Sequence, residues 1–289
     1  MLTSTINKVY QGSYDIHAHR AGQSREWFHE RIRDKDCLLI TAGDSWTWGD
    51  SLGNIDIGSN RWDDYTYRTT HTYGYHLSNM LDTDWVNIGI CGGCNLFIIQ
   101  EAYQFIQNIE KRYKKIIIVF TLTELGRELL DAYNYDDRIQ ELHQAINNYR
   151  SLNDLLIKYE AYTFKLIQEL FDSCIVTRNF TNTFNENKSI LGSKLLDKTW
   201  TEVIAERGNL RSYPNIKLLS HIGIDPLLKF AKNVGKEQWI DLIDNQELGY
   251  TWLENSPYNS NAGTKHPNEQ AHQWWAEHLY KHITNENIS

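Results

Sequence analysis

The chain has 289 residues, of which 41% are hydrophobic and 23% are charged, and its formal net charge is −8. This length suits one large domain with a full hydrophobic core, and the composition excludes a disordered or fibrous protein. Because acidic residues outnumber the scattered Lys and Arg residues, we predict no nucleic-acid partner and favour a neutral or cationic substrate.

Neither a secretion signal nor a membrane span is evident in the sequence. Residues 1–8 contain no apolar run of the kind that signal peptides carry, and no later segment approaches the roughly 18 apolar residues that a membrane helix needs. So few cysteines in so long a chain do not make a disulfide framework; they are Cys37, Cys91, Cys94 and Cys174. We therefore predict no membrane partner and a reducing, cytoplasmic setting.

The first motif in chain order contains His17 and His19, in Tyr-Asp-Ile-His-Ala-His. This spacing resembles the His-x-His motif of metal-dependent hydrolases of the TIM-barrel type, in which both imidazoles bind one metal ion. Such a barrel needs an apolar strand before the motif, and residues 8–14 are too polar for one. A metal-dependent hydrolase is thus a minor alternative, and we predict neither a metal nor a cofactor.

Four short apolar runs are predicted as strands, at residues 37–41, 85–90, 116–120 and 173–177. Their apolar residues are continuous instead of alternating, which is typical of strands covered on both faces in a parallel sheet. Apolar residues at three- and four-residue steps predict helices at three places, residues 96–113, about 138–171 and 271–283. Strands alternating with helices indicate an α/β fold, a three-layer α/β/α sandwich with a mainly parallel central sheet of the flavodoxin-like kind.

Two regions fit this alternation less well. Residues 59–75 are polar but rich in aromatic side chains, and residues 181–246 combine helical and loop patterns. Either region could face a substrate beyond the carboxyl ends of the strands, although ordinary packing is the favoured interpretation of the aromatic residues. We predict one domain over residues 1–289, with an N-terminal extension at 1–35 and a helical and loop excursion at about 181–246.

The first predicted strand runs directly into Gly43-Asp44-Ser45, which places a serine at the carboxyl end of a strand. A serine hydroxyl is a weak nucleophile at neutral pH and needs a base to take its proton. The best candidate for that base is His266, because Pro267 follows it and fixes the entry into the last predicted helix. The alternative for Ser45 is an N-cap that begins the next helix.

These motifs resemble the SGNH, or GDSL-type, hydrolase family, whose four blocks centre on Ser, Gly, Asn and His. Ser45 matches the first block, Gly92 the second and His266 the last, which continues into Pro267 and Asn268. The resemblance extends from about residue 37 to residue 283. It implies an ester hydrolase with Ser45 as nucleophile, His266 as base, and the backbone N–H groups of Ser45 and Gly92 as oxyanion donors.

The chain departs from the family pattern in two blocks. Thr123 stands where the third block has asparagine, so a hydroxyl would replace the amide as oxyanion donor, with Asn95 as a possible substitute. Glycine occupies position 263, where the family has the aspartate that orients the histidine. Glu254 is the leading candidate for this acid; Asn259, Asn261, a backbone carbonyl or a Ser-His pair without an acid are alternatives.

Several segments are also similar to SGNH-like proteins encoded by tailed bacteriophages, namely residues 43–49, 92–95 and 178–181. This similarity implies a virion or host-surface role, such as removal of O-acetyl groups from an acylated carbohydrate, with virion components as assembly partners. The non-enzymatic alternative is a degenerate SGNH domain that serves as a binding or structural module, because fold alone does not establish activity.

Overall fold

The computed structural model describes nine stretches of the chain, residues 29–50, 52–53, 65–90, 93–109, 113–123, 152–179, 185–209, 257–258 and 266–286. Five strands in these stretches form one sheet with the order β1-β3-β2-β4-β5. Their bounds are β1 His29–Arg31, β2 Cys37–Gly43, β3 Asp84–Gly89, β4 Lys115–Leu122 and β5 Ile175–Arg178. All four strands predicted from apolar runs are confirmed, and β1 is an additional strand at the edge.

The central strand β2 is parallel to β3 and β4, and β4 is parallel to β5, whereas β1 pairs with β3 in the antiparallel direction. At the end of β2, Gly43 lies opposite Gly89 on one side and Thr121 on the other. The carboxyl ends of three strands are therefore adjacent. This edge of the sheet is where an open α/β fold offers a site.

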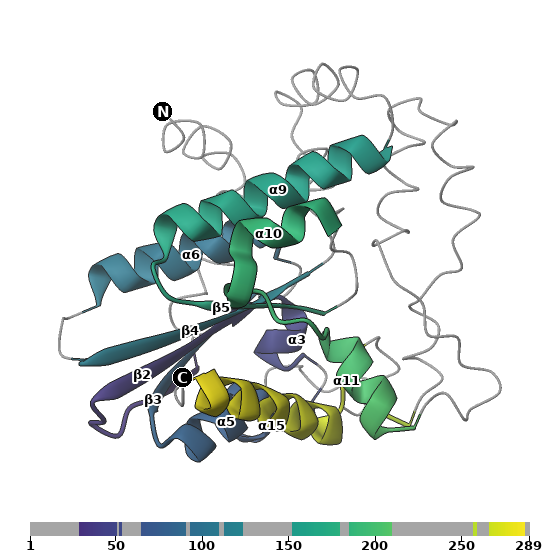
Figure 1. The fold of residues 1–289 in the computed structure, drawn as a ribbon. Coiled ribbons are helices and arrows are strands. Elements are labelled where there is room, and N and C mark those ends of the chain that lie inside the picture. The colour runs from purple at the N-terminus through teal and green to yellow at the C-terminus, as the bar shows by residue number, and fades with distance from the viewer. Residues whose placement is uncertain are drawn as a thin grey trace, which may run out of the picture.

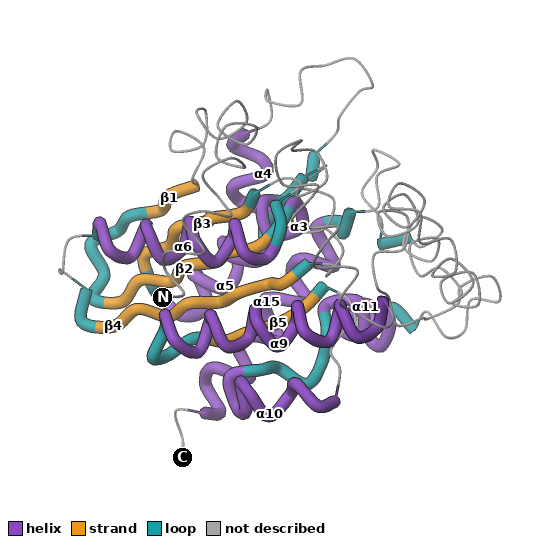
Figure 2. The backbone as a smooth tube through the Cα atoms, turned by 90° about the horizontal axis from the view of Figure 1, so that it is seen from above, coloured by secondary structure: helices purple, strands orange, loops and turns teal. Residues whose placement is uncertain are grey.

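Helices cover both faces of the sheet (Figure 1). On one face lie α6 (Asn95–Asn108) and α9 (Leu152–Leu170), which run side by side along the strands (Figures 1 and 2). The other face packs against α5 (Tyr73–Leu81), α11 (Trp200–Arg207) and α15 (Glu269–Glu286). The α/β/α sandwich with a mainly parallel sheet is thus confirmed.

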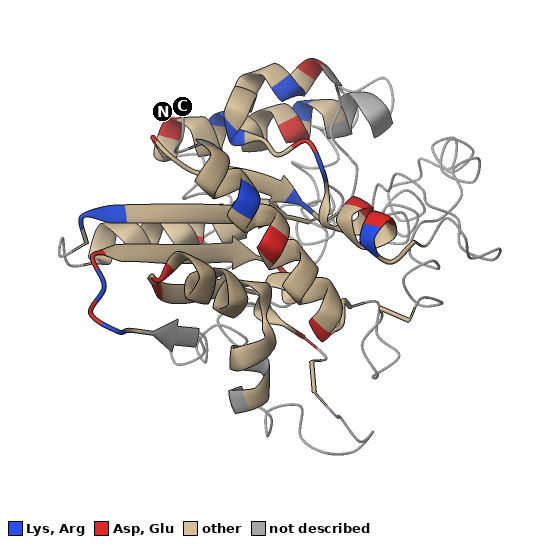
Figure 3. Cartoon of the chain, turned by 60° about the horizontal axis from the view of Figure 1, so that its bottom comes forward, with Lys and Arg blue, Asp and Glu red and all other residues tan. Residues whose placement is uncertain are grey.

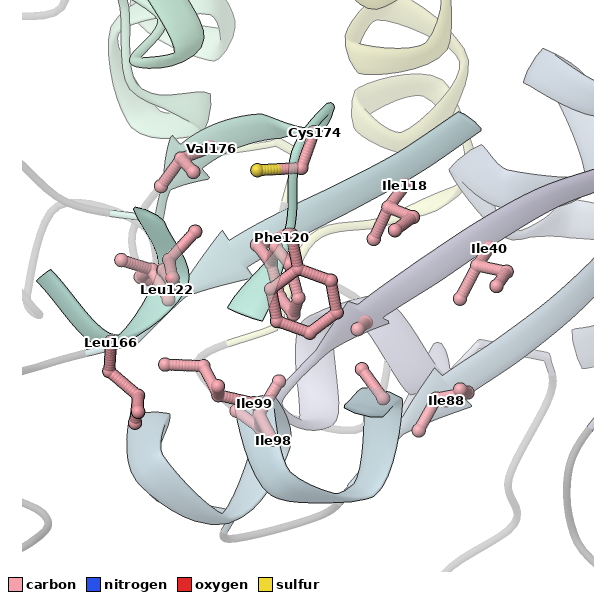
Figure 4. Packing of buried hydrophobic residues seen from close by; sticks show 14 of the residues in the cluster. Ile40, Ile88, Ile98, Ile99, Ile118, Phe120, Leu122, Leu166, Cys174 and Val176 are labelled. Carbon is pink, nitrogen blue, oxygen red and sulfur yellow. The ribbon is translucent and has the colours of Figure 1, made fainter. Parts of the chain in front are cut away.

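Successive residues of β2 pack into two different cores. Leu38 and Ile40 belong to the cluster beneath α6 and α9, while Leu39 belongs to the cluster beneath α5, α11 and α15. Figure 4 shows the first cluster, where Ile40 and Phe120 of the sheet lie on the side of α6. Because both faces of each strand are buried, the strands have continuous apolar sequences.

The predicted helices are confirmed within the described residues, with shifted ends. The one predicted at 96–113 ends at Asn108, because Ile109 is extended with ψ of 135°. The one predicted at 138–171 is seen as α9 from Leu152 onward, and residues 138–151 lie outside the described part of the chain. The last helix is longer than predicted and begins at Glu269.

The two less regular regions contain further helices. Tyr65–His71 forms α4, and α5 begins at Tyr73, whose side chain is completely buried. Residues 185–209 hold the short elements η2 (Asn185–Asn187), α10 (Lys188–Leu191) and η3 (Gly192–Lys194) before α11. Trp200 of α11 is buried in the second core, so this part of the segment packs onto the sandwich.

Basic and acidic residues are interspersed over the described elements (Figure 3). Two exposed or half-exposed pairs lie at α11, Lys198 with Glu206 at 2.7 Å and Arg207 with Glu277 at 2.5 Å. Pairs of this kind contribute little to stability because water screens them.

None of the helices in the described stretches is long and apolar enough to cross a bilayer.

Candidate active site

The turn after β2 places Ser45 at the start of a one-turn helix, α3 (Ser45–Trp48). Asp44 is the N-cap of this helix, and its Oδ1 accepts a 3.0 Å hydrogen bond from the backbone N–H of Trp46. The capping role therefore belongs to Asp44, and the N-cap alternative for Ser45 is wrong. As the first helical residue, Ser45 directs its hydroxyl out of the turn toward His266.

Gly43 and Gly89, which pair between β2 and β3, allow α3 to pack against the ends of these strands. A Cβ on Gly43 would overlap the Thr47 hydroxyl and lie 2.9 Å from the Thr121 carbonyl oxygen. A Cβ on Gly89 would lie 2.5 Å from Cα of Trp48. Real Cβ atoms do not approach other atoms so closely, so the serine turn can occupy this place only because both positions lack a side chain.

His266 lies at the entrance of α15 and faces the serine. Its Nε2 is 2.8 Å from Ser45 Oγ, although 221 positions separate the two residues. The adjoining segment is held by Asn268, whose backbone N–H donates to the Tyr258 carbonyl at 2.8 Å and whose Oδ1 accepts from the Ala271 N–H at 3.1 Å. The structure thus brings together the two residues predicted as nucleophile and base. For Oγ to donate to Nε2, the imidazole proton must sit on Nδ1.

The Asp44 carboxylate accepts hydrogen bonds from three segments beside Ser45 and is completely buried. Besides the Trp46 N–H, Oδ1 accepts from Asn179 Nδ2 at 3.0 Å, and Oδ2 accepts from the Thr123 hydroxyl at 2.7 Å. The turn after β2 is thereby tied to the ends of β4 and β5. Hydrogen bonds to a buried carboxylate are among the stronger ones in proteins.

Thr123 and Asn95, the two predicted candidates for a side-chain oxyanion donor, lie beside this carboxylate and bind each other. The Thr123 N–H donates to Asn95 Oδ1 at 2.8 Å, and Asn95 Nδ2 donates to the Thr123 carbonyl at 3.2 Å. The single proton of the Thr123 hydroxyl is directed at Asp44. In this arrangement the Thr123 hydroxyl supports the serine turn.

The remaining predicted site residues lie outside the described part of the chain. They are Gly92, Glu254, Asn259, Asn261, Gly263, His17 and His19. The neighbour of Gly92 is described: the Gly93 N–H donates to the Ile90 carbonyl at 2.8 Å, and the Ile90 N–H donates to the Gly43 carbonyl at 2.9 Å. Among the described residues, no group of three or more His, Cys, Asp or Glu side chains could hold a metal ion.

A second acidic residue, Asp50, approaches the imidazole from the far end of α3. Its Oδ2 is 3.6 Å from Nε2 of His266, the same nitrogen that contacts the serine. The backbone N–H of Asp50 donates to the Ser45 carbonyl at 2.9 Å, which turns the chain back toward Ser45. The side chains of Asp50 and His266 are 15% and 18% exposed, so water screens their interaction only in part.

Behind the site, buried Tyr73 and His272 connect α5, α15 and the sheet. The Tyr73 hydroxyl lies 2.9 Å from the Thr121 hydroxyl, and burial raises the pKa of Tyr73 to about 12. His272 Nδ1 accepts a 3.1 Å hydrogen bond from the Tyr73 N–H, so the imidazole proton lies on Nε2. Burial, followed by the nearby His76, holds the pKa of His272 well below its usual 6.5. This contact fixes α15 six residues after His266.

Similar folds occur among solved structures of esterases. One carbohydrate esterase, described for its divergent catalytic and non-catalytic binding functions, has 13% identity and a TM-score of 0.43, over 88% of this chain and 67% of the other. An acetyl xylan esterase from the rumen bacterium Butyrivibrio proteoclasticus has 11% identity and a TM-score of 0.41, over 89% and 65% of the two chains. An SGNH-hydrolase family esterase has 15% identity and a TM-score of 0.32, over 72% and 98%.

This chain spans about two thirds of the length of the two carbohydrate esterases. No protein-family model matches the sequence, and no curated protein does either. At these identities and TM-scores, the similarity assigns neither an activity nor a substrate to the chain.

Two residues of this site were not predicted from the sequence: Asp50 as a neighbour of His266, and Asp44 as the structural carboxylate of the turn. A signal for Asp50 does exist in the sequence. Gly49 adopts a left-handed conformation with φ of 81° and ends α3 after a single turn. A glycine four residues after Ser45 therefore predicts a chain reversal, which brings the next residue back toward the serine.

Proposed function

We propose that this protein is a serine ester hydrolase in which Ser45 attacks the substrate carbonyl and His266 is the general base. The observation that carries this proposal is the 2.8 Å contact between Ser45 Oγ and His266 Nε2. A serine hydroxyl becomes an effective nucleophile when an adjacent imidazole takes its proton, and this distance lies within hydrogen-bond reach.

In the first half of the reaction, Oγ forms a bond to the carbonyl carbon and its proton passes to Nε2. The resulting oxyanion needs N–H donors. The backbone N–H of Ser45 is suited to this role, because the first residue of a helix has no carbonyl partner one turn earlier. Gly92 is the proposed second donor. Thr123 would join them only if its hydroxyl turned away from Asp44.

In the second half, the proton on Nε2 passes to the leaving alcohol as the carbonyl–oxygen bond breaks, which leaves an acyl group on Ser45. A water molecule then gives a proton to Nε2 as its oxygen attacks the acyl carbonyl. The bond between the carbonyl carbon and Oγ breaks, the proton on Nε2 returns to Oγ, and the carboxylic acid leaves. No cofactor takes part in either half. Among esters, we propose an O-acetylated carbohydrate as the substrate class, since a neutral substrate is not repelled by the net charge of −8.

A fluorophosphonate probe tests the nucleophile directly. We expect mass spectrometry to find the probe on Ser45, and Ser45→Ala to abolish both labelling and hydrolysis of p-nitrophenyl acetate. Ser193→Ala is the matched control, because Ser193 is exposed in η3 and is not part of the site. A folded wild-type protein that takes up no probe and hydrolyses no ester would contradict the proposal and favour a binding module. Release of acetate from acetylated xylan tests the substrate class separately.

A further inference from the structure

We infer that Asp50 is the carboxylate that stabilises the protonated form of His266 during acyl transfer. This inference rests on the proposed function. Its basis is that Asp50 Oδ2 and Ser45 Oγ approach the same atom, His266 Nε2, at 3.6 Å and 2.8 Å. Asp50 thus acts through the reacting nitrogen itself, whereas the aspartate of the family pattern, which is replaced here by Gly263, would act through Nδ1.

The effect of Asp50 differs between the resting state and the transition state. At rest, Nε2 is uncharged and its lone pair accepts the hydrogen bond of the serine hydroxyl. The nearby carboxylate then has no positive charge to stabilise. Once the proton has moved, Nε2–H carries positive charge within 3.6 Å of the Asp50 carboxylate. Only interactions that strengthen in the transition state speed the chemical step, and this attraction has that property.

The backbone holds the carboxylate in place for this role. The Asp50 N–H donates to the Ser45 carbonyl, and the Leu52 N–H donates to the Gly49 carbonyl at 3.2 Å. Asp50 is therefore fixed to the same one-turn helix that carries the nucleophile. Because Asp50 and Ser45 are fixed to one short segment, the distance between them stays the same if the segment that carries His266 moves.

Other ionisable groups lie near the imidazole in the described part of the chain. His272 of α15 interacts electrostatically with His266, but burial keeps it uncharged. Asp44 adjoins Ser45 in sequence, and its two oxygens accept hydrogen bonds from Trp46, Asn179 and Thr123. Asp50 places a carboxylate oxygen 3.6 Å from Nε2.

The test is the pH dependence of p-nitrophenyl acetate hydrolysis by wild type and Asp50→Asn. Because the carboxylate favours imidazolium, its loss should move the acid limb of the kcat/KM profile to lower pH by about one unit. We also expect kcat to fall roughly ten- to a hundredfold with little change in KM. A purely structural side chain would not shift the acid limb.

Two variants serve as controls. Asp50→Glu keeps the charge and should retain the acid limb of wild type. Asp82→Asn removes the same charge at the opposite end of the sheet, where Asp82 is 67% exposed and binds Lys35, and should change neither quantity. NMR titration of the His266 imidazole in Ser45→Ala, with and without Asp50→Asn, measures the same shift without turnover.

The outcomes separate the inference from the proposed function. An active wild type whose Asp50→Asn variant keeps kcat, the acid limb and the imidazole titration overturns the inference alone. A wild-type protein that hydrolyses no ester and takes up no fluorophosphonate overturns the proposed function, and the inference with it.

Discussion

The Thr123 hydroxyl donates a 2.7 Å hydrogen bond to Asp44 Oδ2, and so joins the end of β4 to the turn that carries Ser45. Both residues are almost completely buried, with Thr123 1% and Asp44 0% exposed. A buried carboxylate that loses a donor keeps its desolvation cost but is compensated by fewer hydrogen bonds.

Thr123→Val should therefore lower the free energy of unfolding by roughly 1.5–3 kcal/mol, measured by urea denaturation. We expect kcat to change by less than about threefold, since the hydroxyl serves the turn. Thr123→Ser keeps the hydroxyl and is the matched control. A ten- to thousandfold loss of kcat in the Val variant, with KM and stability unchanged, would instead make Thr123 an oxyanion donor.

Gly89→Ala should damage both stability and activity. Its Cβ would lie 2.5 Å from Cα of Trp48 and push α3 away from the strand ends. Overpacking of this kind costs about 1–3 kcal/mol and here displaces Ser45 from His266. Gly192→Ala is the comparison, because that Cβ would meet no atom within 4 Å and only the φ of +54° opposes it. The Gly192 variant should lose stability but keep its kcat; equal kcat values for the two variants would argue against the displacement of Ser45.

Stability should fall as the pH drops below about 6.5. His272 has its pKa held well below that value in the folded state, so the unfolded chain binds a proton that the folded chain does not. This contribution to stability is complete above the unfolded pKa and is lost as the pH falls through it. His76 and His278, whose pKa values burial also lowers, add in the same direction.

His272→Asn isolates one part of this dependence. The amide oxygen can accept the Tyr73 N–H in place of Nδ1, but it does not titrate. In urea denaturation between pH 5 and 8, the variant should show a shallower slope, by up to about 1.4 kcal/mol per pH unit. An unchanged slope would show that His272 does not carry the effect.

Chelators should leave ester hydrolysis unchanged, because a serine nucleophile with an imidazole base needs no Lewis acid. The measurement is kcat/KM for p-nitrophenyl acetate before and after dialysis against EDTA. Loss of activity with recovery on added zinc would direct attention to His17 and His19.

The elements that could be predicted from the sequence are those whose pattern of apolar residues reflects burial. Strands such as Cys37–Gly43 have apolar residues toward both cores, which is visible without a structure. The strand His29–Arg31 has no such pattern, because a three-residue edge strand pairs through its backbone. Tyr73–Leu81 was missed as a helix because its aromatic and polar residues obscure the helical period.

The site was predictable to the extent that it depends on local motifs. Ser45 follows a strand and His266 precedes a proline at a helix start, and the structure brings these two residues together. The partners of Asp44 come from residues 79 and 135 positions away, and no local pattern indicates such contacts. Asp50 required knowing that α3 ends after one turn.

The 221 positions between Ser45 and His266 also have a consequence for how the protein folds. Contacts between distant parts of a chain carry a large loop-closure entropy and tend to form late. The sheet and α6 can assemble from the first 123 residues together with α9 and β5, while the imidazole arrives only when α15 docks against α5. The contact between Ser45 Oγ and His266 Nε2 would then be among the last to form during folding.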